Sequence, residues 1–361
     1  MNLAYAIERG NNNYNLIRLF ASLMVIFGHS FVLFNPFGAK EPIEYFLKSD
    51  YTGSLAVIVF FFFSGIYITH SYINSQSNIR FIIMRIFRIW PAFLMCLFLT
   101  VFIFGPILST NSNYLFEPET YRYLFKNGTL LFVTIDKLPG VFINNYLPFI
   151  VNGSLWTLPI EVRCYGVLFI AGTLGCFKRP YILIILIIMI FIFWDNHIFN
   201  AIMLGLATSK LLLIFLFGSL SYIYKEQIIL DYRIAFLMII ICIVSYLLLY
   251  SETILYITLI YSLLTIGASN ILKKIKIPGD YSYGIYIYGF LVQQIFAFYF
   301  PSLSSYKSMF FTIPITILIG ILSWHFIEKI SMSIAKDFAA KVEQKNISLF
   351  NPNSKKLWPK L

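Results

Sequence analysis

The sequence predicts an all-α polytopic membrane protein with about ten transmembrane helices, and two observations carry this prediction. First, 59% of the 361 residues are hydrophobic and 12% are charged, whereas a soluble globular chain averages about 45–50% apolar and about 25% charged residues. Second, the apolar residues gather into runs close to the roughly 17–25 residues that cross a bilayer as a helix. A soluble protein of this size would need far more charge to cover its surface.

Ten apolar runs predict ten membrane spans, each about the length of a membrane-crossing helix. We place them at residues 16–35, 54–73, 89–106, 156–176, 181–195, 208–224, 234–250, 253–271, 282–300 and 309–328. Residues 129–151 are apolar only in patches, so we expect a re-entrant or interfacial part of a long loop there. Residues 196–208 fit a partly inserted loop between the fifth and sixth spans.

The distribution of lysine and arginine predicts the orientation of the chain. With a cytoplasmic N-terminus, the cytoplasmic segments hold 19 of these residues and the outer segments hold seven, as the positive-inside rule requires. We therefore expect both termini in the cytoplasm. One membrane domain would cover residues 1–330, and residues 331–361 would form a short basic cytoplasmic tail that anionic lipid attracts.

The formal net charge of +11 does not indicate a nucleic-acid partner. The basic residues are spread over short gaps between apolar runs, and no basic domain or nucleic-acid-binding module is recognisable. The four cysteines and four histidines show no metal-ligand spacing, so we expect no metal site. The cysteines fit small buried hydrophobic residues.

The first span carries two ionisable residues, Arg18 and His29. Such residues each cost roughly 2.5–3.5 kcal/mol within a membrane, so they are candidates for a functional site. They are eleven residues apart, which is about 20° past three helical turns, so they share one helix face with about 16 Å between them. A snorkelling arginine and a histidine bonded to a neighbouring helix would explain this span alone equally well.

Three arginines, Arg80, Arg85 and Arg88, lie at the cytoplasmic end of the third span. Arg85 and Arg88 are three residues apart and share a helix face. Positive-inside anchoring would explain all three. A guanidinium group also binds phosphate oxygens through two parallel hydrogen bonds, so the pair fits a site for a cytoplasmic ligand with several phosphates.

A carboxylate enters the fourth span in the stretch SLWTLPIEVRCYG, residues 154–166. Glu161 would lie at a depth similar to that of His29, where an unpaired carboxylate is costly. A His29–Glu161 pair would hold the imidazole in one tautomer and raise its basicity. Pairing of Glu161 with Arg163 through another helix is the structural alternative.

Further polar residues lie in the last two spans. Ser282 and Tyr283 bring hydroxyl groups into the ninth span and are candidate substrate contacts, as is Trp156 at the start of the fourth span. Tyrosine at a membrane edge is also typical of an aromatic belt. His325 and Glu328 lie one turn apart at the cytoplasmic end of the tenth span, where we expect a structural polar cluster.

Together these stretches resemble acyltransferase family 3, the bacterial membrane O-acetyltransferases that act on polysaccharides. The resemblance covers roughly residues 14–330, and its six pieces keep the family's order. They are Arg-x10-His at 18–29, FFFFSGIYIT at 60–69, RIFRIWP at 85–91, SLWTLPIEVRCYG at 154–166, SYGIYIY at 282–288 and Glu-Lys at 328–329. Gly289 and Leu291 stand where the family often has His-x-Pro, and Ile330 stands where a proline is common, which leaves subfamily and acceptor open.

The resemblance implies a ten-helix bundle in the bacterial cytoplasmic membrane, with cytoplasmic acetyl-CoA as acyl donor and a glycan hydroxyl group as acceptor. By motif position, His29 matches the essential histidine, Glu161 the motif carboxylate and Arg18 the motif arginine. Arg85 and Arg88 match the arginine pair linked with the donor. In the mechanism we expect, Arg18 would join them in holding the donor phosphates, and Glu161 would orient His29. His29 would act as a general base on the hydroxyl group or would accept the acetyl group covalently.

Two other classes of protein stay open. A secondary transporter also places ionisable residues at mid-membrane, but transporters commonly show internal repeats, and we find no repeat in this sequence. A structural scaffold for glycan assembly would leave His29 dispensable.

Overall fold

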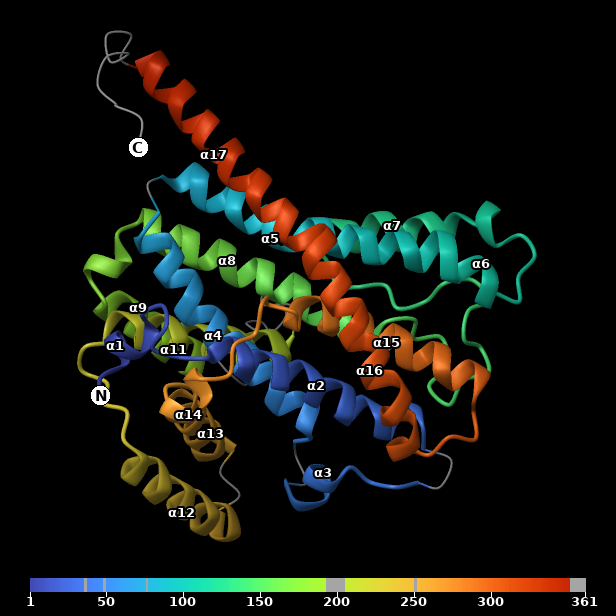
Figure 1. Cartoon of the computed structure of the whole chain (residues 1–361), viewed down its shortest axis with the longest axis horizontal. Coiled ribbons are helices and arrows are strands. Elements are labelled where there is room, and N and C mark those ends of the chain that lie inside the picture. Colours follow the sequence, from blue (N-terminus) through green and yellow to red (C-terminus); the bar gives the residue numbers. More distant parts are fainter. Residues whose placement is uncertain (36–37, 48–49, 76, 193–204, 250–251, 351–361) are drawn as a thin grey trace.

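The computed structural model describes residues 1–350 with the exception of 36–37, 48–49, 76, 193–204 and 250–251. Within these residues the chain is helical and has no β-strand (Figure 1). Isolated β-bridges join Asn2 to Ile229 and Ser109 to Val141. The predicted all-α fold is therefore confirmed.

Helices cover most of the described part of each predicted span. The longer helices are α2 (Tyr14–Leu33), α4 (Thr52–Ile73), α5 (Asn78–Phe98), α7 (Pro118–Thr129), α8 (Thr157–Thr173), α9 (Tyr181–Ile192), α11 (Leu206–Ile223), α12 (Tyr232–Leu249), α13 (Glu252–Gly267), α15 (Ser282–Tyr299), α16 (Ser305–Ser323) and α17 (Lys329–Phe350). The shorter ones are α1 (Leu3–Ile7), α3 (Pro42–Leu47), α6 (Gly105–Leu108) and α14 (Asn270–Lys273).

Within the described residues, five continuous helical stretches are long and apolar enough to cross a membrane, at residues 14–33, 52–73, 78–108, 153–173 and 305–344. The helices α9, α11, α12 and α13 are apolar but shorter. The protein is therefore a helical membrane protein. Its ten crossings and the cytoplasmic side of its termini stay predictions.

Two of the long stretches contain π-helical turns, η1 (Leu99–Phe104) after α5 and η5 (Trp324–Glu328) after α16. A π-helical turn rotates the residues that follow it relative to a regular helix, and such turns are frequent at functional sites. In η5 the side chain of Glu328 is turned into the interior, where the residue is 1% exposed. Of the predicted polar cluster at the end of the tenth span, Glu328 is therefore buried, whereas His325 is exposed.

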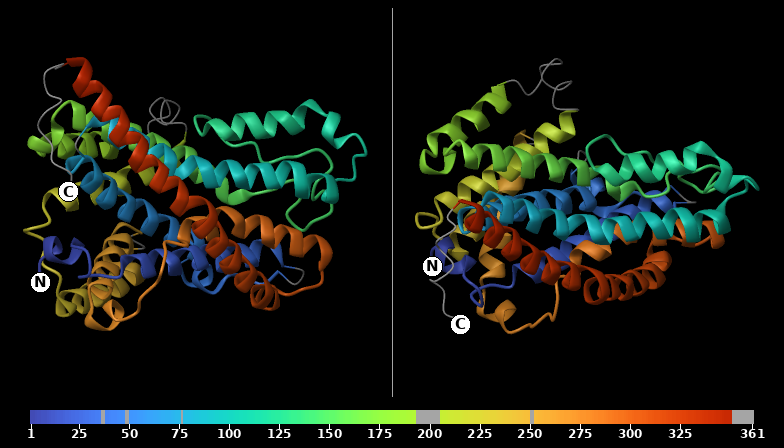
Figure 2. Two further views of the ribbon diagram at one scale, coloured as in Figure 1. Left: turned by 45° about the horizontal axis from the view of Figure 1, so that its top comes forward. Right: turned by 90° about the horizontal axis from the view of Figure 1, so that it is seen from above.

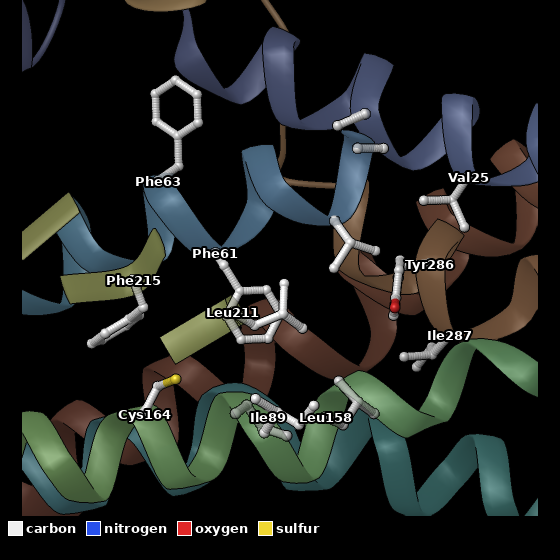
Figure 3. Close-up of a cluster of buried hydrophobic side chains, with 14 of the residues drawn as sticks. Val25, Phe61, Phe63, Ile89, Leu158, Cys164, Leu211, Phe215, Tyr286 and Ile287 are labelled. Atoms are coloured by element: carbon white, nitrogen blue, oxygen red, sulfur yellow. The ribbon is translucent and has the colours of Figure 1, made fainter. Parts of the chain in front are cut away.

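The centre of the molecule is formed by α4, which packs against α2 on one side and α11 on the other. Figure 3 shows Phe61 of α4 beside Leu211 of α11, whereas Phe63 points to the opposite side of α4, where its ring lies 5.0 Å from that of Tyr14 in α2. The contact with α11 is close because glycines face each other: a Cβ on Gly65 would lie 2.0 Å from the Phe215 carbonyl oxygen, and one on Gly218 would lie 2.2 Å from that of Phe62. Small residues allow such close approach between membrane helices.

The long loop expected before the fourth span is present, and residues 130–152 contain no helix. Its end is tied to α15 by a buried amide pair. Gln294 Nε2 donates to the carbonyl oxygens of Leu147 at 3.0 Å and Ile150 at 2.7 Å, and Asn145 Nδ2 donates to Gln294 Oε1 at 2.6 Å. These bonds satisfy buried polar groups that would otherwise destabilise an irregular segment.

The predicted basic tail is a helix as far as residue 350, and residues 351–361 lie outside the described part of the chain. This helix, α17, runs alongside α5 (Figures 1 and 2). Glu343 accepts hydrogen bonds from Ser77 Oγ at 2.5 Å and Arg80 Nη1 at 3.1 Å, and Ala335 and Ala339 are fully buried. Arg80 is thus a helix-packing residue.

The glycine contact between α4 and α11 generates a prediction. Replacing Gly65 with alanine should force the two helices apart, because the new methyl group would overlap the Phe215 carbonyl oxygen. We expect a destabilisation of about 1–3 kcal/mol, typical of overpacking, measured as a lower Tm in detergent. The matched control is Gly166→Ala in α8, where a Cβ would meet no atom within 4 Å. Equal Tm values for the two variants would contradict the close contact.

Candidate active site

A cavity of about 200 Å³ opens among α2, α4, α5, α8 and the start of α15. We call it the arginine cavity. Six of the eight predicted site residues line it: Arg18, Arg85, Arg88, Glu161, Ser282 and Tyr283. Residues of the motif FFFFSGIYIT also line it, so the fold brings together residues from five of the six motifs.

Two of these arginines belong to a row of four ionisable side chains linked by hydrogen bonds. Asp280, two residues before α15, accepts hydrogen bonds from Arg18 Nη1 at 2.8 Å and from Arg88 Nη2 at 2.6 Å. Arg88 Nη1 also donates to Glu328 Oε2 at 2.9 Å. Ser323 Oγ donates to the other oxygen of Glu328 at 3.0 Å. Both carboxylates are therefore paired, as buried charges must be.

Asp280 bonds to two of these four side chains, Arg18 and Arg88. It was not among the site residues predicted from the sequence. Burial by itself raises the pKa of a carboxyl group, but Arg18 and Arg88 outweigh burial and lower the pKa of Asp280 to about 2. The carboxylate therefore stays ionised at neutral pH. The available signal was its position directly before the motif SYGIYIY, in a chain that has only 16 acidic residues.

Arg85 has a different environment from Arg88. Its Nη2 lies 3.4 Å from Ser71 Oγ, and its buried Nε has no hydrogen-bond partner among the described residues. No carboxylate in the described part of the chain forms a salt bridge with it. The predicted arginine pair is thus divided, because Arg88 is held by two carboxylates while Arg85 keeps an unpaired donor.

Glu161 also lines the arginine cavity, but it does not pair with His29. Its carboxylate accepts a hydrogen bond from the hydroxyl group of Tyr165, one turn further along α8, and a longer one of 3.4 Å from Ser64 Oγ. Neither His29 nor Arg163 bonds to it within the described residues. Neither of the two expected pairings is therefore found. The carboxylate is bonded instead to Tyr165, which lies four positions along the same helix and so on the same face.

A second cavity of about 200 Å³ lies further along α2, and we call it the histidine cavity. The two remaining predicted residues, His29 and Trp156, line it. The imidazole meets Phe290 edge to face at 5.0 Å, and its buried Nδ1 has no hydrogen-bond partner among the described residues. Because buried polar atoms are normally paired, this nitrogen is a candidate contact for a substrate hydroxyl group.

The two cavities share a wall. Val57 of α4 and Tyr286 of α15 line both of them. Figure 3 shows the Tyr286 ring between Val25 of α2 and Leu158 of α8. Its hydroxyl group lies 2.6 Å from Thr157 Oγ1, and its ring meets Phe60 edge to face at 5.7 Å. The sequence analysis did not select Tyr286 as a site residue, since a tyrosine in this motif fits an aromatic belt equally well.

The hydroxyl groups of Ser282 and Tyr283 are already used within the protein. Ser282 Oγ donates to Asp280 Oδ1 at 2.6 Å, and the Tyr283 hydroxyl group donates to the Ile89 carbonyl oxygen at 2.9 Å. The Arg88 guanidinium lies 5.7 Å from the Tyr283 ring centroid. These two residues therefore position the charged groups of the arginine cavity.

Lys210 of α11 adds a cation to the histidine cavity. From the sequence, Lys210 was only one of the seven basic residues assigned to the outer segments. Its Nζ lies 2.5 Å from the Tyr256 hydroxyl group, 3.8 Å from Asp50 and 3.6 Å from Glu252. Two carboxylates thus balance this cation, and the group links α11 to α13 beside His29's cavity.

Comparison with known proteins gives the family. A family model described as an acyltransferase domain matches residues 11–327. The "O-acetyl transferase" of Shigella phage Sf6 is 29% identical over 335 residues, which cover 88% of this chain and 95% of that protein. "Nodulation protein 10" of Rhizobium leguminosarum bv. viciae is 30% identical over 164 residues, or 43% of this chain and 42% of that protein. No solved structure matches the chain.

The family model covers most of the chain and every site residue described above except Glu328. An enzyme is therefore favoured over the transporter and the scaffold that the sequence left open. The chain belongs to the acyltransferase family, as its ordered motifs predicted, and it is a membrane enzyme that transfers acyl groups.

Proposed function

We propose that the protein is a membrane-bound O-acetyltransferase that moves an acetyl group from cytoplasmic acetyl-CoA to a hydroxyl group of a cell-surface or lipid-linked glycan. The observation that carries this proposal is the pair of cavities along α2, one lined by arginines and the other by His29, which share Val57 and Tyr286 as a wall. The similarity to the O-acetyl transferase of Shigella phage Sf6 supports the acetyl group. The enzyme would act in the cytoplasmic membrane of a bacterium.

The arginine cavity suits the donor. Acetyl-CoA is an anion with several phosphates, and guanidinium groups bind phosphate oxygens. Arg85 is the best placed of the three, because its Nε is unpaired while Arg18 and Arg88 are held by carboxylates. In the orientation that the positive-inside rule predicts, this cavity faces the cytoplasm, where acetyl-CoA is made.

The histidine cavity suits the acceptor. A sugar hydroxyl group beside His29 would lose its proton to the imidazole while its oxygen attacks the thioester carbonyl carbon. The bond from carbon to sulfur breaks, and the thiolate of CoA takes the proton from the imidazolium. The products are an acetyl ester and CoA, so atoms and charges balance. Tyr286 belongs to the wall that the acetyl group must pass, and its hydroxyl group lies 2.6 Å from Thr157 Oγ1 of the arginine cavity.

His29 supports a second route with the same outcome. Its unpaired nitrogen would attack the thioester, carry the acetyl group, and pass it to the hydroxyl group in a second step. The two routes differ in one intermediate. Radiolabelled acetyl groups retained on the protein in the absence of acceptor would identify the carrier route.

Replacing His29 with alanine should abolish transfer, because both routes need the imidazole. General acid–base catalysis typically contributes about 10²- to 10⁴-fold, so we expect residual activity of 1% or less by that scale. The measurement is the acetyl-ester content of the surface glycan by NMR, with the amount of protein in the membrane determined in parallel.

The matched control for that variant is His70→Ala. His70 lies near the end of α4, contacts the Tyr222 hydroxyl group at 3.0 Å and lines neither cavity. This variant should retain activity. Full acetylation of the glycan by His29→Ala would eliminate both routes.

The two arginines of the predicted pair should respond differently to substitution. Arg85→Ala should leave the fold intact and raise KM for acetyl-CoA about tenfold, the effect of roughly 1.4 kcal/mol of lost binding. Arg88→Ala leaves Asp280 and Glu328 without a shared partner, so it should destabilise the protein by about 3–5 kcal/mol. Steady-state kinetics and thermal unfolding in detergent separate the two effects. An unchanged KM for acetyl-CoA in Arg85→Ala would mean that Arg85 does not bind the donor and serves only positive-inside anchoring.

A further inference from the structure

A third cavity, of about 470 Å³, adjoins the histidine cavity at the end of α2. We call it the loop cavity, because Asn35, several residues of the stretch 38–44 and Tyr146 of the long loop line much of it. Tyr51 lines both the loop cavity and the histidine cavity, and the loop and arginine cavities share no lining residue. The three cavities therefore follow one another along α2, in the order arginine, histidine, loop.

Tyr51 is held against α2 beside the reactive histidine. A Cβ on Gly28 would lie 2.8 Å from the Tyr51 ring and 2.9 Å from the backbone nitrogen of Gly53, and a Cβ on Gly53 would lie 2.5 Å from the same ring. Only glycine leaves room for the ring at these two positions. The ring is thus a preorganised wall next to His29, common to both cavities.

The polar groups of the loop cavity are few and distinct. The buried Asn35 Oδ1 has no hydrogen-bond partner among the described residues, so it can accept a hydrogen bond from a ligand. Glu41 is already bonded to Thr52 Oγ1 and to the backbone N–H of Glu44. The side chain of Glu44 lines the cavity at an exposed position, and so does Lys40.

Aromatic residues provide the apolar part of the lining. Tyr51 lines the cavity, and so does Tyr146 of the long loop, which is 61% exposed. A tyrosine ring offers an apolar face together with a polar edge. Apolar walls with a few convergent polar groups are typical of a small-molecule site.

We propose that the loop cavity binds an uncharged sugar residue of the acceptor glycan, next to the residue whose hydroxyl group is acetylated at His29. This inference rests on the proposed function and adds a location for the acceptor chain. A pyranose ring has apolar C–H faces, which pack on tyrosine, and hydroxyl groups, which donate to an amide oxygen such as Asn35 Oδ1. Two carboxylates and one lysine line the cavity, so a carboxylated sugar would meet net repulsion.

The test uses purified enzyme in lipid nanodiscs with radiolabelled acetyl-CoA. Two acceptors are compared: the surface polysaccharide of the host bacterium, freed of esters by mild alkali, and the methyl glycosides obtained from that polysaccharide by methanolysis. The polymer fills both cavities, whereas a single glycoside reaches only His29. We expect kcat/KM to be at least tenfold higher for the polymer.

Tyr146→Ala and Asn35→Ala should each remove most of this preference by raising KM for the polymer. Their KM for acetyl-CoA and their kcat/KM with the methyl glycosides should stay at the wild-type values. The matched control is Tyr299→Ala, an exposed tyrosine at the end of α15 that does not line the loop cavity. It should keep the full preference.

Three outcomes would overturn the inference: no preference for the polymer in the wild type, an unchanged preference in both cavity variants, or an equal loss with both acceptors. Better use of the polymer by Glu44→Gln would indicate a carboxylated sugar and contradict the uncharged assignment. Absence of transfer from the wild-type enzyme to either acceptor would instead contradict the proposed function itself.

Discussion

The interaction on which the site depends is the double ion pair of Asp280 with Arg18 and Arg88. It joins α2, α5 and the segment before α15 at one point, and the π-helical turn η5 adds Glu328 to Arg88. Such buried pairs add little net stability compared with an apolar contact, but loss of one partner leaves an uncompensated charge. Their effect here is geometric: they fix the helices around the arginine cavity and occupy two guanidinium groups, so that Arg85 is left with an unpaired donor.

The helix α2 is the axis of the site. It carries Arg18, His29 and, just past its end, Asn35, and each of these residues lines one of the three successive cavities. A helix rises about 1.5 Å per residue, so one helix carries residues of all three cavities. Tyr286 lies between the arginine and histidine cavities, and Tyr51 lies between the histidine and loop cavities. Under the proposed function, the donor would enter this series at the arginine cavity and the acceptor at the loop cavity.

The all-α fold could be predicted from the sequence, because an apolar run of about 17–25 residues indicates a helix that contacts lipid. The described parts of the ten runs lie mainly in helices, and the long loop before α8 was recognised because residues 129–151 are apolar only in patches. Helix α17 was not predicted, since its packing on α5 relies on small alanines such as Ala335 and on the ion pair of Arg80 with Glu343. Hydropathy does not detect a polar helix that is stabilised by a neighbouring element.

The sequence alone determined the family and most of the residues that line the arginine and histidine cavities. This was possible because the six ordered motifs can be recognised without any knowledge of contacts. It also placed Arg18 and His29 on one face of one helix. Only the tertiary structure decided the partners: Glu161 bonds to Tyr165 and Ser64 and not to His29, and Asp280 holds two of the arginines. Helical phase determines which face a side chain occupies, but which other helix meets that face depends on packing between segments far apart in the chain.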